Sequence, residues 1–380
     1  LSRKGDVVVV TINHRLGAFG YLHLEDLCGD EFASSGSVGM LDIVAALAWV
    51  RDNVAAFGGD PGNVTIFGES GGGAKVSVLM AMPAAHGLFH KAIMQSGPAV
   101  EMMSRDDATR TAHQVLAELG LEPARVADLR KVSAAQLLQA QMGVLRKISS
   151  MSFANRRRVG FNPVIDGKHL PLGPFEPVAP AISAHVPLMI GTNKDEMTLF
   201  FGLSPWLDQL GEEAMRDRVR MFVGERGEIV LHTYRRARPH ATNRDLMLAI
   251  ATDAAMRIPS LITADRKVAQ HAAPVFVYLF TWETPVLGGV LKSPHALEIP
   301  FIFDTLESSA LTGDSPARFP LADKMSRTWI QFARSGDSNS NSIPRWPAYS
   351  LERRRTMIFD VPCRVEDDPY GEERLAWNDR

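Results

Sequence analysis

The chain has 380 residues, of which 46% are hydrophobic and 22% charged, and its formal net charge is −2. This length suits one large α/β domain or two average ones, with a sizeable core. The near-neutral charge gives no electrostatic reason to expect nucleic acid or an anionic membrane as a partner. We find no apolar run long enough to span a bilayer and no HExxH, CxxC or P-loop motif, and we expect no metal or cofactor.

The N-terminal segment is expected to form a buried strand. Residues 7–12 are a continuous β-branched run, which predicts a strand covered on both faces in a parallel sheet. The sequence enters this run almost at once, without a methionine or a leader, so we expect the N-terminal part of the fold to be missing. Apolar positions then recur at helical spacing from Met40 to Val54, and Gly58 and Gly59 end that helix.

The most informative stretch is residues 63–75, which predict a short strand, a sharp turn and a helix. The turn has the pattern G-x-S-x-G around Ser70, typical of a nucleophile held on a strained strand-to-helix turn. Gly68 and Gly72 are expected to leave room where side chains would collide. The N–H groups at the start of the helix would stabilise negative charge near the serine. Ser70 is therefore the candidate nucleophile.

The remainder of the chain alternates strands with helices. Strands are predicted at 91–97, 186–192 and 275–282, and a helix at 321–334. Helical insertions are predicted at 101–160 and 203–272, the second interrupted at Pro239 and Pro259. We expect one domain over 1–380 with an open, mostly parallel sheet flanked by helices. Catalytic groups in such a sheet follow the carboxyl ends of strands.

A nucleophilic serine needs a base, and the base needs an acid to orient it. In α/β-hydrolases the chain order is serine, acid, histidine. Four late histidines leave room for an acid before them: His232, His240, His271 and His295. The first three are most simply surface residues, whereas His295 follows the 275–282 strand on a loop rich in glycine and proline. His295 is the favoured base.

The acid has two candidates that the chemistry alone does not separate. Asp195 and Glu196 both follow the strand at 186–190. Either carboxylate would suit the role.

Several segments together resemble the type-B carboxylesterases, the carboxylesterase/cholinesterase branch of the α/β-hydrolase fold. The bacterial members, often called para-nitrobenzyl esterases, are the most similar. The resembling segments follow the family order over nearly the whole chain: 5–17, 47–54, 57–61, 67–71, 95–97, 163–167, 191–196, 295–301 and 346–349.

This resemblance implies roles for individual residues. It favours Glu196 as the acid and supports His295 as the base, and Ser96 matches a serine that helps to hold both. Gly71 stands where the family more often has alanine, and its N–H is expected to bind the oxyanion. The family's His-Gly-Gly-Gly-type oxyanion loop has no counterpart, so we expect this chain to be an N-terminally truncated form with an exposed sheet edge and impaired activity.

The implied activity is hydrolysis of a small carboxylic ester through an acyl-enzyme, with no cofactor. One alternative is an inactive cholinesterase-like adhesion or interaction protein, which the presence of Ser70, Glu196 and His295 argues against. Another is a lipase for longer-chain esters, which differs in pocket shape rather than in triad. Localisation, oligomeric state and any pairing of Cys28 with Cys363 are left open by the sequence.

Overall fold

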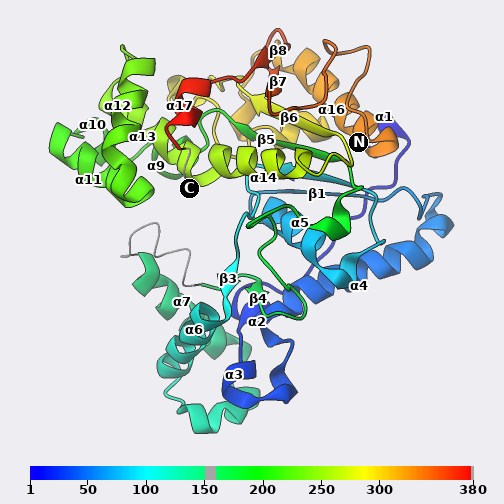
Figure 1. Cartoon of the computed structure of the whole chain (residues 1–380), viewed down its shortest axis with the longest axis vertical. Coiled ribbons are helices and arrows are strands. Elements are labelled where there is room, and N and C mark those ends of the chain that lie inside the picture. Colours follow the sequence, from blue (N-terminus) through cyan, green and yellow to red (C-terminus); the bar gives the residue numbers. More distant parts are fainter. Residues whose placement is uncertain (150–159, 378–380) are drawn as a thin grey trace.

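A six-stranded sheet lies at the centre of the computed structural model, which describes residues 1–149 and 160–377 (Figure 1). Its strands stand in the order β1 (Thr65–Glu69), β2 (Lys91–Gln95), β5 (Leu188–Asn193), β6 (Val275–Phe280), β7 (Arg355–Phe359) and β8 (Arg364–Asp367). Neighbouring strands are parallel except for β8, which is antiparallel to β7. The expected mostly parallel sheet is confirmed.

The central strands are buried on both faces, and alternate side chains enter different cores. In β6, Val275 and Val277 pack into one core, while Phe276 and Tyr278 pack into the other. This two-residue alternation follows from strand geometry. The sheet is therefore covered on both sides.

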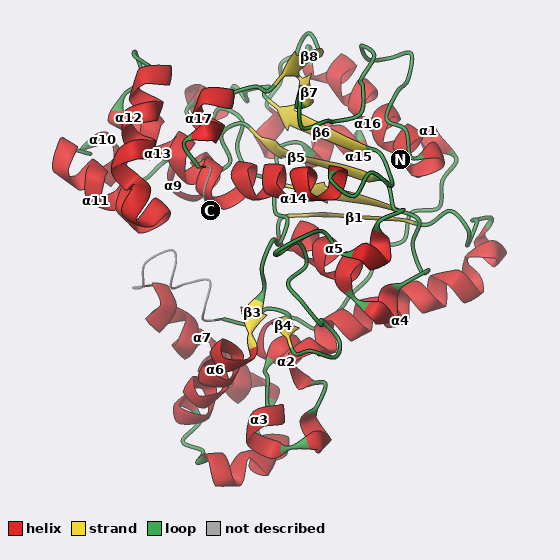
Figure 2. Cartoon of the chain, in the orientation of Figure 1, coloured by secondary structure: helices red, strands yellow, loops and turns green. Residues whose placement is uncertain are grey.

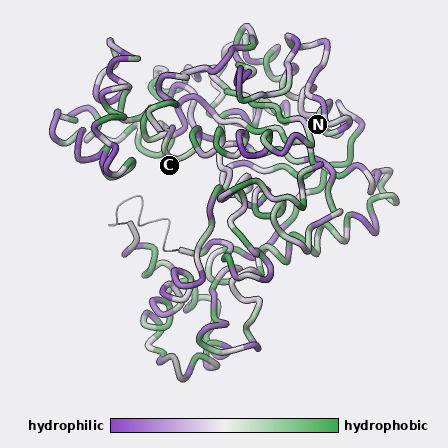
Figure 3. Tube along the Cα trace, viewed as in Figure 1, coloured by the Kyte–Doolittle hydropathy of each residue, from purple (hydrophilic) through white to green (hydrophobic). Residues whose placement is uncertain are grey.

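Helices supply both layers (Figure 2). One core is lined by α4 (Val38–Asn53), α5 (Gly71–Ala81) and α14 (Ile258–Val268), and the other by α15 (Ile299–Phe303) and α16 (Arg318–Ser335). Short helices near the ends of the chain are α1 (Ser2–Gly5), α2 (Gly17–Tyr21), α3 (Glu25–Cys28) and α17 (Gly371–Leu375). Figure 3 shows hydrophobic stretches running through the sheet region.

Two helical groups project from this centre (Figure 1). The first contains α6 (Arg105–Glu118) and α7 (Ala134–Ser149), beside the two-stranded parallel sheet of β3 (Met103–Ser104) and β4 (Val164–Ile165). The second contains α9 (Thr198–Phe201), α10 (Pro205–Asp208), α11 (Glu212–Val223), α12 (Gly227–Ala237) and α13 (Asn243–Thr252). They fall within the ranges 101–160 and 203–272, apart from α9 and β4, and residues 150–159 of the first range lie outside the described residues.

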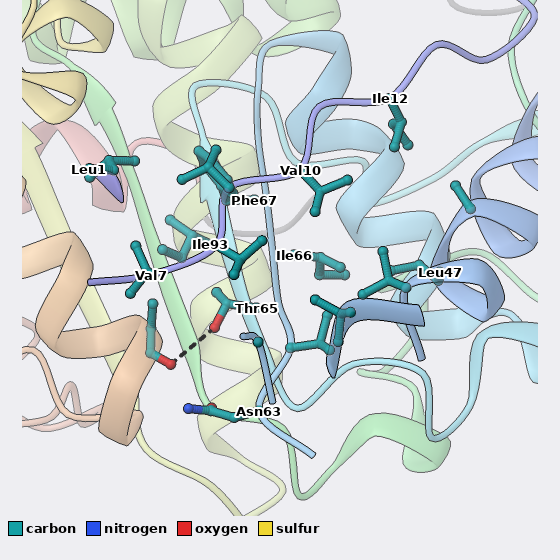
Figure 4. A pocket seen from close by; sticks show the side chains of 18 of the residues that line it. Leu1, Val7, Val10, Ile12, Leu47, Asn63, Thr65, Ile66, Phe67 and Ile93 are labelled. Carbon is teal, nitrogen blue, oxygen red and sulfur yellow. Dashed lines mark hydrogen bonds between the residues drawn. The ribbon is translucent and has the colours of Figure 1, made fainter. Parts of the chain in front are cut away.

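The predicted buried strand at residues 7–12 is wrong. The segment is extended but belongs to no sheet, and Val8, Val10 and Ile12 are each 42% exposed. A cavity of about 580 Å³ separates it from β1, and both line its walls (Figure 4). Across that gap the segment cannot form the backbone hydrogen bonds that define a strand. In the described sheet β1 is therefore an edge strand.

Proline 239 separates α12 from α13 as predicted, but the predicted interruption at Pro259 is wrong. Pro259 lies in the first turn of α14, directly after a π-helical turn at Asp253–Arg257. Proline has no N–H to donate within this helix, and the wider π-helical turn before it accommodates the ring. The helix therefore continues from Asn243 to Val268.

Two helical stretches among the described residues, Asp30–Phe57 and Asn243–Val268, are long and apolar enough to cross a membrane. Of the most apolar window in each, 39% and 78% respectively is buried inside the protein, and core helices have the same composition. Cys28 and Cys363 are both free thiols.

Candidate active site

Ser70 lies between β1 and α5 in a strained backbone conformation, with φ 56° and ψ −120°. Its N–H donates to the Gln95 carbonyl at 2.9 Å, which fixes the turn against β2. A Cβ on Gly68 would lie 2.5 Å from the Gly72 carbonyl carbon, and a Cβ on Gly97 would lie 2.4 Å from the Ser70 carbonyl oxygen. The predicted need for glycine is therefore confirmed at Gly68.

At Gly72 the same expectation is wrong. A Cβ there would meet nothing within 4 Å among the described residues. The crowding comes from the Gly72 backbone approaching Gly68, so a side chain is excluded on one side of the turn only.

His295 and Glu196 form a short, buried contact. Their side chains are 6% and 0% exposed, and His295 Nδ1 lies 2.6 Å from Glu196 Oε2. The second carboxylate oxygen, Oε1, accepts the N–H of Asn193 at 2.7 Å. The backbone N–H of His295 also donates to the Glu196 carbonyl at 3.2 Å. Both ends of the pair are thus held in place.

The rival residues are placed elsewhere. Asp195 Oδ2 accepts the Ser293 N–H at 3.4 Å rather than contacting His295. His232, His240 and His271 are exposed, as expected.

The three candidate residues follow three parallel strands of the sheet: Ser70 follows β1, Glu196 follows β5 and His295 comes on the loop after β6. Parallel strands end at one edge, so residues far apart in the chain meet there.

The structure does not join His295 to Ser70 by a hydrogen bond. No hydrogen bond links Ser70 Oγ to His295 among the described residues. His295 Nε2 lies instead 3.1 Å from Oε1 of Glu69, the residue before Ser70. That oxygen has no aligned hydrogen-bond partner, so the contact is electrostatic. The Phe200 ring covers the imidazole at a centroid distance of 5.2 Å.

Sequence reasoning missed two carboxylates beside His295. Glu69 belongs to the turn motif, and Glu298 follows the histidine at a spacing of three residues. Glu298 is fully buried and accepts from Gln95 Nε2 at 3.1 Å and Asn193 Nδ2 at 2.7 Å. Gln95 is held in turn by Trp329 Nε1 at 3.2 Å. A signal existed, since both glutamates lie inside the recognised motifs, but spacing alone gave them no partner.

This carboxylate cluster sets the charge of the site. Burial lowers the pKa of His295, but Glu196, Glu69 and Glu298 outweigh it, so the pKa lies above its ordinary 6.5. Burial, with the repulsion of Glu298 and Glu196, raises the pKa of Glu69 to about 7. Burial and Glu196 also raise the pKa of Glu298. Glu69 and Glu298 therefore keep their protons to a higher pH than ordinary glutamates do.

Gly71 and Ser96 differ in how the structure supports them. Gly71 is the first residue of α5, so its N–H has no intrahelical acceptor and is available to an oxyanion. Ser96 is fully buried, and its Oγ has no hydrogen-bond partner, so the structure shows no link from it to Glu196 or His295.

Among the described residues, no group of three or more His, Cys, Asp or Glu side chains is arranged to hold a metal ion. The chemistry available at this edge of the sheet is that of a serine, an imidazole and carboxylates.

Comparisons with known proteins give matches over nearly the whole chain. The model of the carboxylesterase family matches residues 1–377. The para-nitrobenzyl esterase of Bacillus subtilis (strain 168) is 38% identical over 380 residues, covering 98% of this chain and 73% of that protein. The liver carboxylesterase of Sus scrofa is 33% identical, covering 100% of this chain and 69% of that protein. The crystal structure of Geobacillus stearothermophilus carboxylesterase EST55 at pH 6.2 has a TM-score of 0.87 and 40% identity, covering 99% of this chain and 77% of that one.

Proposed function

We propose, from the premise that this chain belongs to the carboxylesterase family and is a carboxylic ester hydrolase of the α/β-hydrolase fold, that it works through an acyl-enzyme on Ser70. The observation that carries the proposal is the 2.6 Å contact between His295 and Glu196 at the sheet edge where Ser70 turns into α5. A serine hydroxyl is a weak nucleophile until such a base takes its proton.

The proposed steps use this chain's own groups. Ser70 Oγ attacks the ester carbonyl while His295 Nε2 accepts its proton, and His295 then returns that proton to the leaving alcohol. Glu196 holds the imidazole and stabilises its charged form, and the Gly71 N–H binds the oxyanion. A water molecule then attacks the acyl-enzyme while His295 accepts its proton. His295 returns that proton to Ser70 Oγ, and the carboxylic acid product is released.

The proposal requires a small movement of the base. In the structure His295 Nε2 contacts the side chain of Glu69, the residue directly before Ser70 in the chain. Catalytic hydrogen bonds are often long in unliganded enzymes and tighten with substrate. Rotation of the imidazole so that Nε2 moves from Glu69 to Ser70 Oγ would allow Nε2 to accept the serine proton. A supporting role for Ser96 stays a prediction.

We further propose that residues 1–380 form one domain with helical insertions at 101–160 and 203–272. Each described group of helices has an apolar core of its own, and Leu261 and Phe161 join these two cores to one of the cores that cover the sheet. The substrate is proposed to be a small-molecule ester. An ester chain-length series would separate this class from a lipase.

The test is hydrolysis of p-nitrophenyl acetate by the wild-type chain, Ser70→Ala and a matched control. We expect Ser70→Ala to fall to the background rate, because the proposed mechanism then lacks its acyl acceptor. Ser308→Ala removes an exposed hydroxyl and should leave the rate unchanged. Turnover retained by Ser70→Ala would refute the scheme.

A further inference from the structure

Lys75 lies in α5, four residues after Gly71, and its side chain runs back along the helix toward Ser70. Lys75 Nζ donates to the Gly71 carbonyl oxygen at 3.1 Å. Residues four apart share one helix face, and long side chains point toward the helix N-terminus. The ammonium is thereby brought to the first turn of α5.

This position places a positive charge beside the proposed oxyanion donor. A Cβ on Gly71 would lie 3.6 Å from Lys75 Nζ, so the ammonium is in contact with the residue itself. The N and O atoms of one residue are within about 3.6 Å by covalent geometry. Lys75 Nζ therefore lies within about 7 Å of the Gly71 N–H.

The charge is poorly compensated. Burial is what lowers the pKa of Lys75, with no acidic group offsetting it, and no carboxylate within the described chain forms an ion pair with its Nζ. Lys75 also lines the cavity of Figure 4, whose walls include Val10, Ile66 and Phe67. Lys75 is half-buried, and the apolar part of these walls screens its charge less than bulk water does.

We propose that the Lys75 ammonium stabilises the oxyanion that forms during ester hydrolysis, together with the Gly71 N–H; this rests on the proposed function of Ser70. The oxyanion carries a full negative charge only in the tetrahedral intermediate and its transition states. A nearby fixed cation lowers their free energy more than that of the neutral ester. Gly71 leaves the approach open, since it has no side chain between the ammonium and the turn.

The kinetic test compares Lys75→Gln, Lys75→Arg and the wild type with p-nitrophenyl acetate. Glutamine keeps a hydrogen-bond donor for the Gly71 carbonyl and removes the charge. An oxyanion that accepts the Gly71 N–H lies up to about 3 Å beyond that nitrogen. At about 7–10 Å from Nζ and an effective dielectric constant of about 20, we expect kcat to fall about fifteen- to fiftyfold with KM little changed. Lys75→Arg keeps the charge and should recover most of the rate. Lys168→Met, which removes an exposed lysine charge elsewhere, should have no effect.

A binding test separates charge from fold. A trifluoromethyl ketone adds to the serine as an anionic adduct, whereas its methyl ketone analogue binds as a neutral molecule. Lys75→Gln should weaken the first by about the same factor as kcat and leave the second unchanged, with an unaltered melting temperature.

Two results would overturn the inference: Lys75→Gln as fast as the wild type, or equal weakening of both ketones. If Lys75→Gln does not fold, Lys75→Met is measured in the same assays. The Ser70→Ala variant distinguishes the two proposals. Turnover that survives Ser70→Ala refutes the proposal that Ser70 is the nucleophile. Turnover that requires Ser70 but not Lys75 refutes only the proposal that Lys75 stabilises the oxyanion.

Discussion

His295 lies among Glu196, Glu69 and Glu298, and this arrangement governs the pH range in which it can act as a base. The carboxylates favour the charged imidazolium more than burial opposes it. An imidazolium cannot accept the serine proton. The carboxylates therefore stabilise the imidazolium that forms when His295 accepts a proton. The same effect lowers the activity at low pH, where His295 is already protonated.

We predict that kcat/KM for p-nitrophenyl acetate falls as pH decreases through a midpoint above 6.5. Glu69→Gln removes a charge that raises the pKa of His295, so its midpoint should move to lower pH. The check is a rate profile of both proteins from about pH 4 to pH 9. A flat wild-type profile, or a midpoint that rises in Glu69→Gln, would contradict the assigned base.

Gly68 and Gly72 provide a matched pair at the turn. Gly68→Ala forces a methyl against the Gly72 backbone, and we expect a loss of about 1–3 kcal/mol in the free energy of unfolding. Gly72→Ala enters open space in the first turn of α5 and should be neutral or stabilising. Urea unfolding of both variants measures the difference, and equal losses would show that the turn is not limited by this contact.

At the scale of elements, the periodicity of apolar residues predicted helices and strands, but backbone pairing determined which of the predicted strands formed. The helix from Met40 and the strands at β2, β5 and β6 were predictable because their apolar positions match one period throughout. Residues 7–12 have an equally strong pattern but form no strand, since a strand also needs a hydrogen-bonding neighbour. The strand β7 was missed because Arg353, Arg354 and Arg355 obscure its short apolar run, which only the pairing with β6 reveals.

The edge of β1 and the segment beside it should promote self-association. Val10 is 42% exposed along the cavity, next to an edge strand that presents unpaired backbone groups. We expect Val10→Lys to slow aggregation of a concentrated solution, measured by light scattering. Leu351→Lys, at a residue of similar exposure (43%) away from the edge, should leave the rate unchanged. If both variants slowed aggregation equally, aggregation would depend on general surface hydrophobicity rather than on the edge of β1.

Across the whole molecule, a buried ionic network ties α17 to the helical group that follows Glu196. Arg257 Nε donates to Asp253 Oδ1 at 2.7 Å, and Arg238 Nε donates to Glu373 Oε1 of α17 at 2.6 Å. The neighbouring Thr252 accepts the N–H of Met197, the residue after Glu196, at 3.2 Å. The loop that carries Glu196 is thus held in place by residues from distant parts of the chain.

Removing one member of this network should be costly. Asp253→Ala leaves the buried Arg257 without its close partner, and we expect a loss of about 3–5 kcal/mol in the free energy of unfolding. Asp208→Ala breaks an exposed pair with Arg244 and should cost at most about 1 kcal/mol. Chemical unfolding of the two variants decides between them, and a similar small loss in both would mean that Arg257 finds another partner.

The ionic network and the carboxylate cluster could not be predicted from the sequence. The order of motifs along the chain made Ser70 and His295 candidates, because each follows a recognisable strand. The same strand precedes both Asp195 and Glu196, and only the family resemblance favoured Glu196. The order of motifs could not predict that His295 Nε2 faces Glu69, since that contact depends on side-chain packing between segments far apart in the chain. Glu298 is likewise held by Gln95 and Asn193 on neighbouring strands, contacts that the sequence spacing does not reveal.

The most direct test of the account is to trap the covalent intermediate. The protein would be quenched in acid during turnover of p-nitrophenyl acetate and examined by intact mass spectrometry and peptide mapping. We predict a mass increase of one acetyl group, located on the peptide that contains Ser70 and absent from Ser70→Ala. An acetyl group on another residue that forms and decays at the rate of turnover would contradict the account.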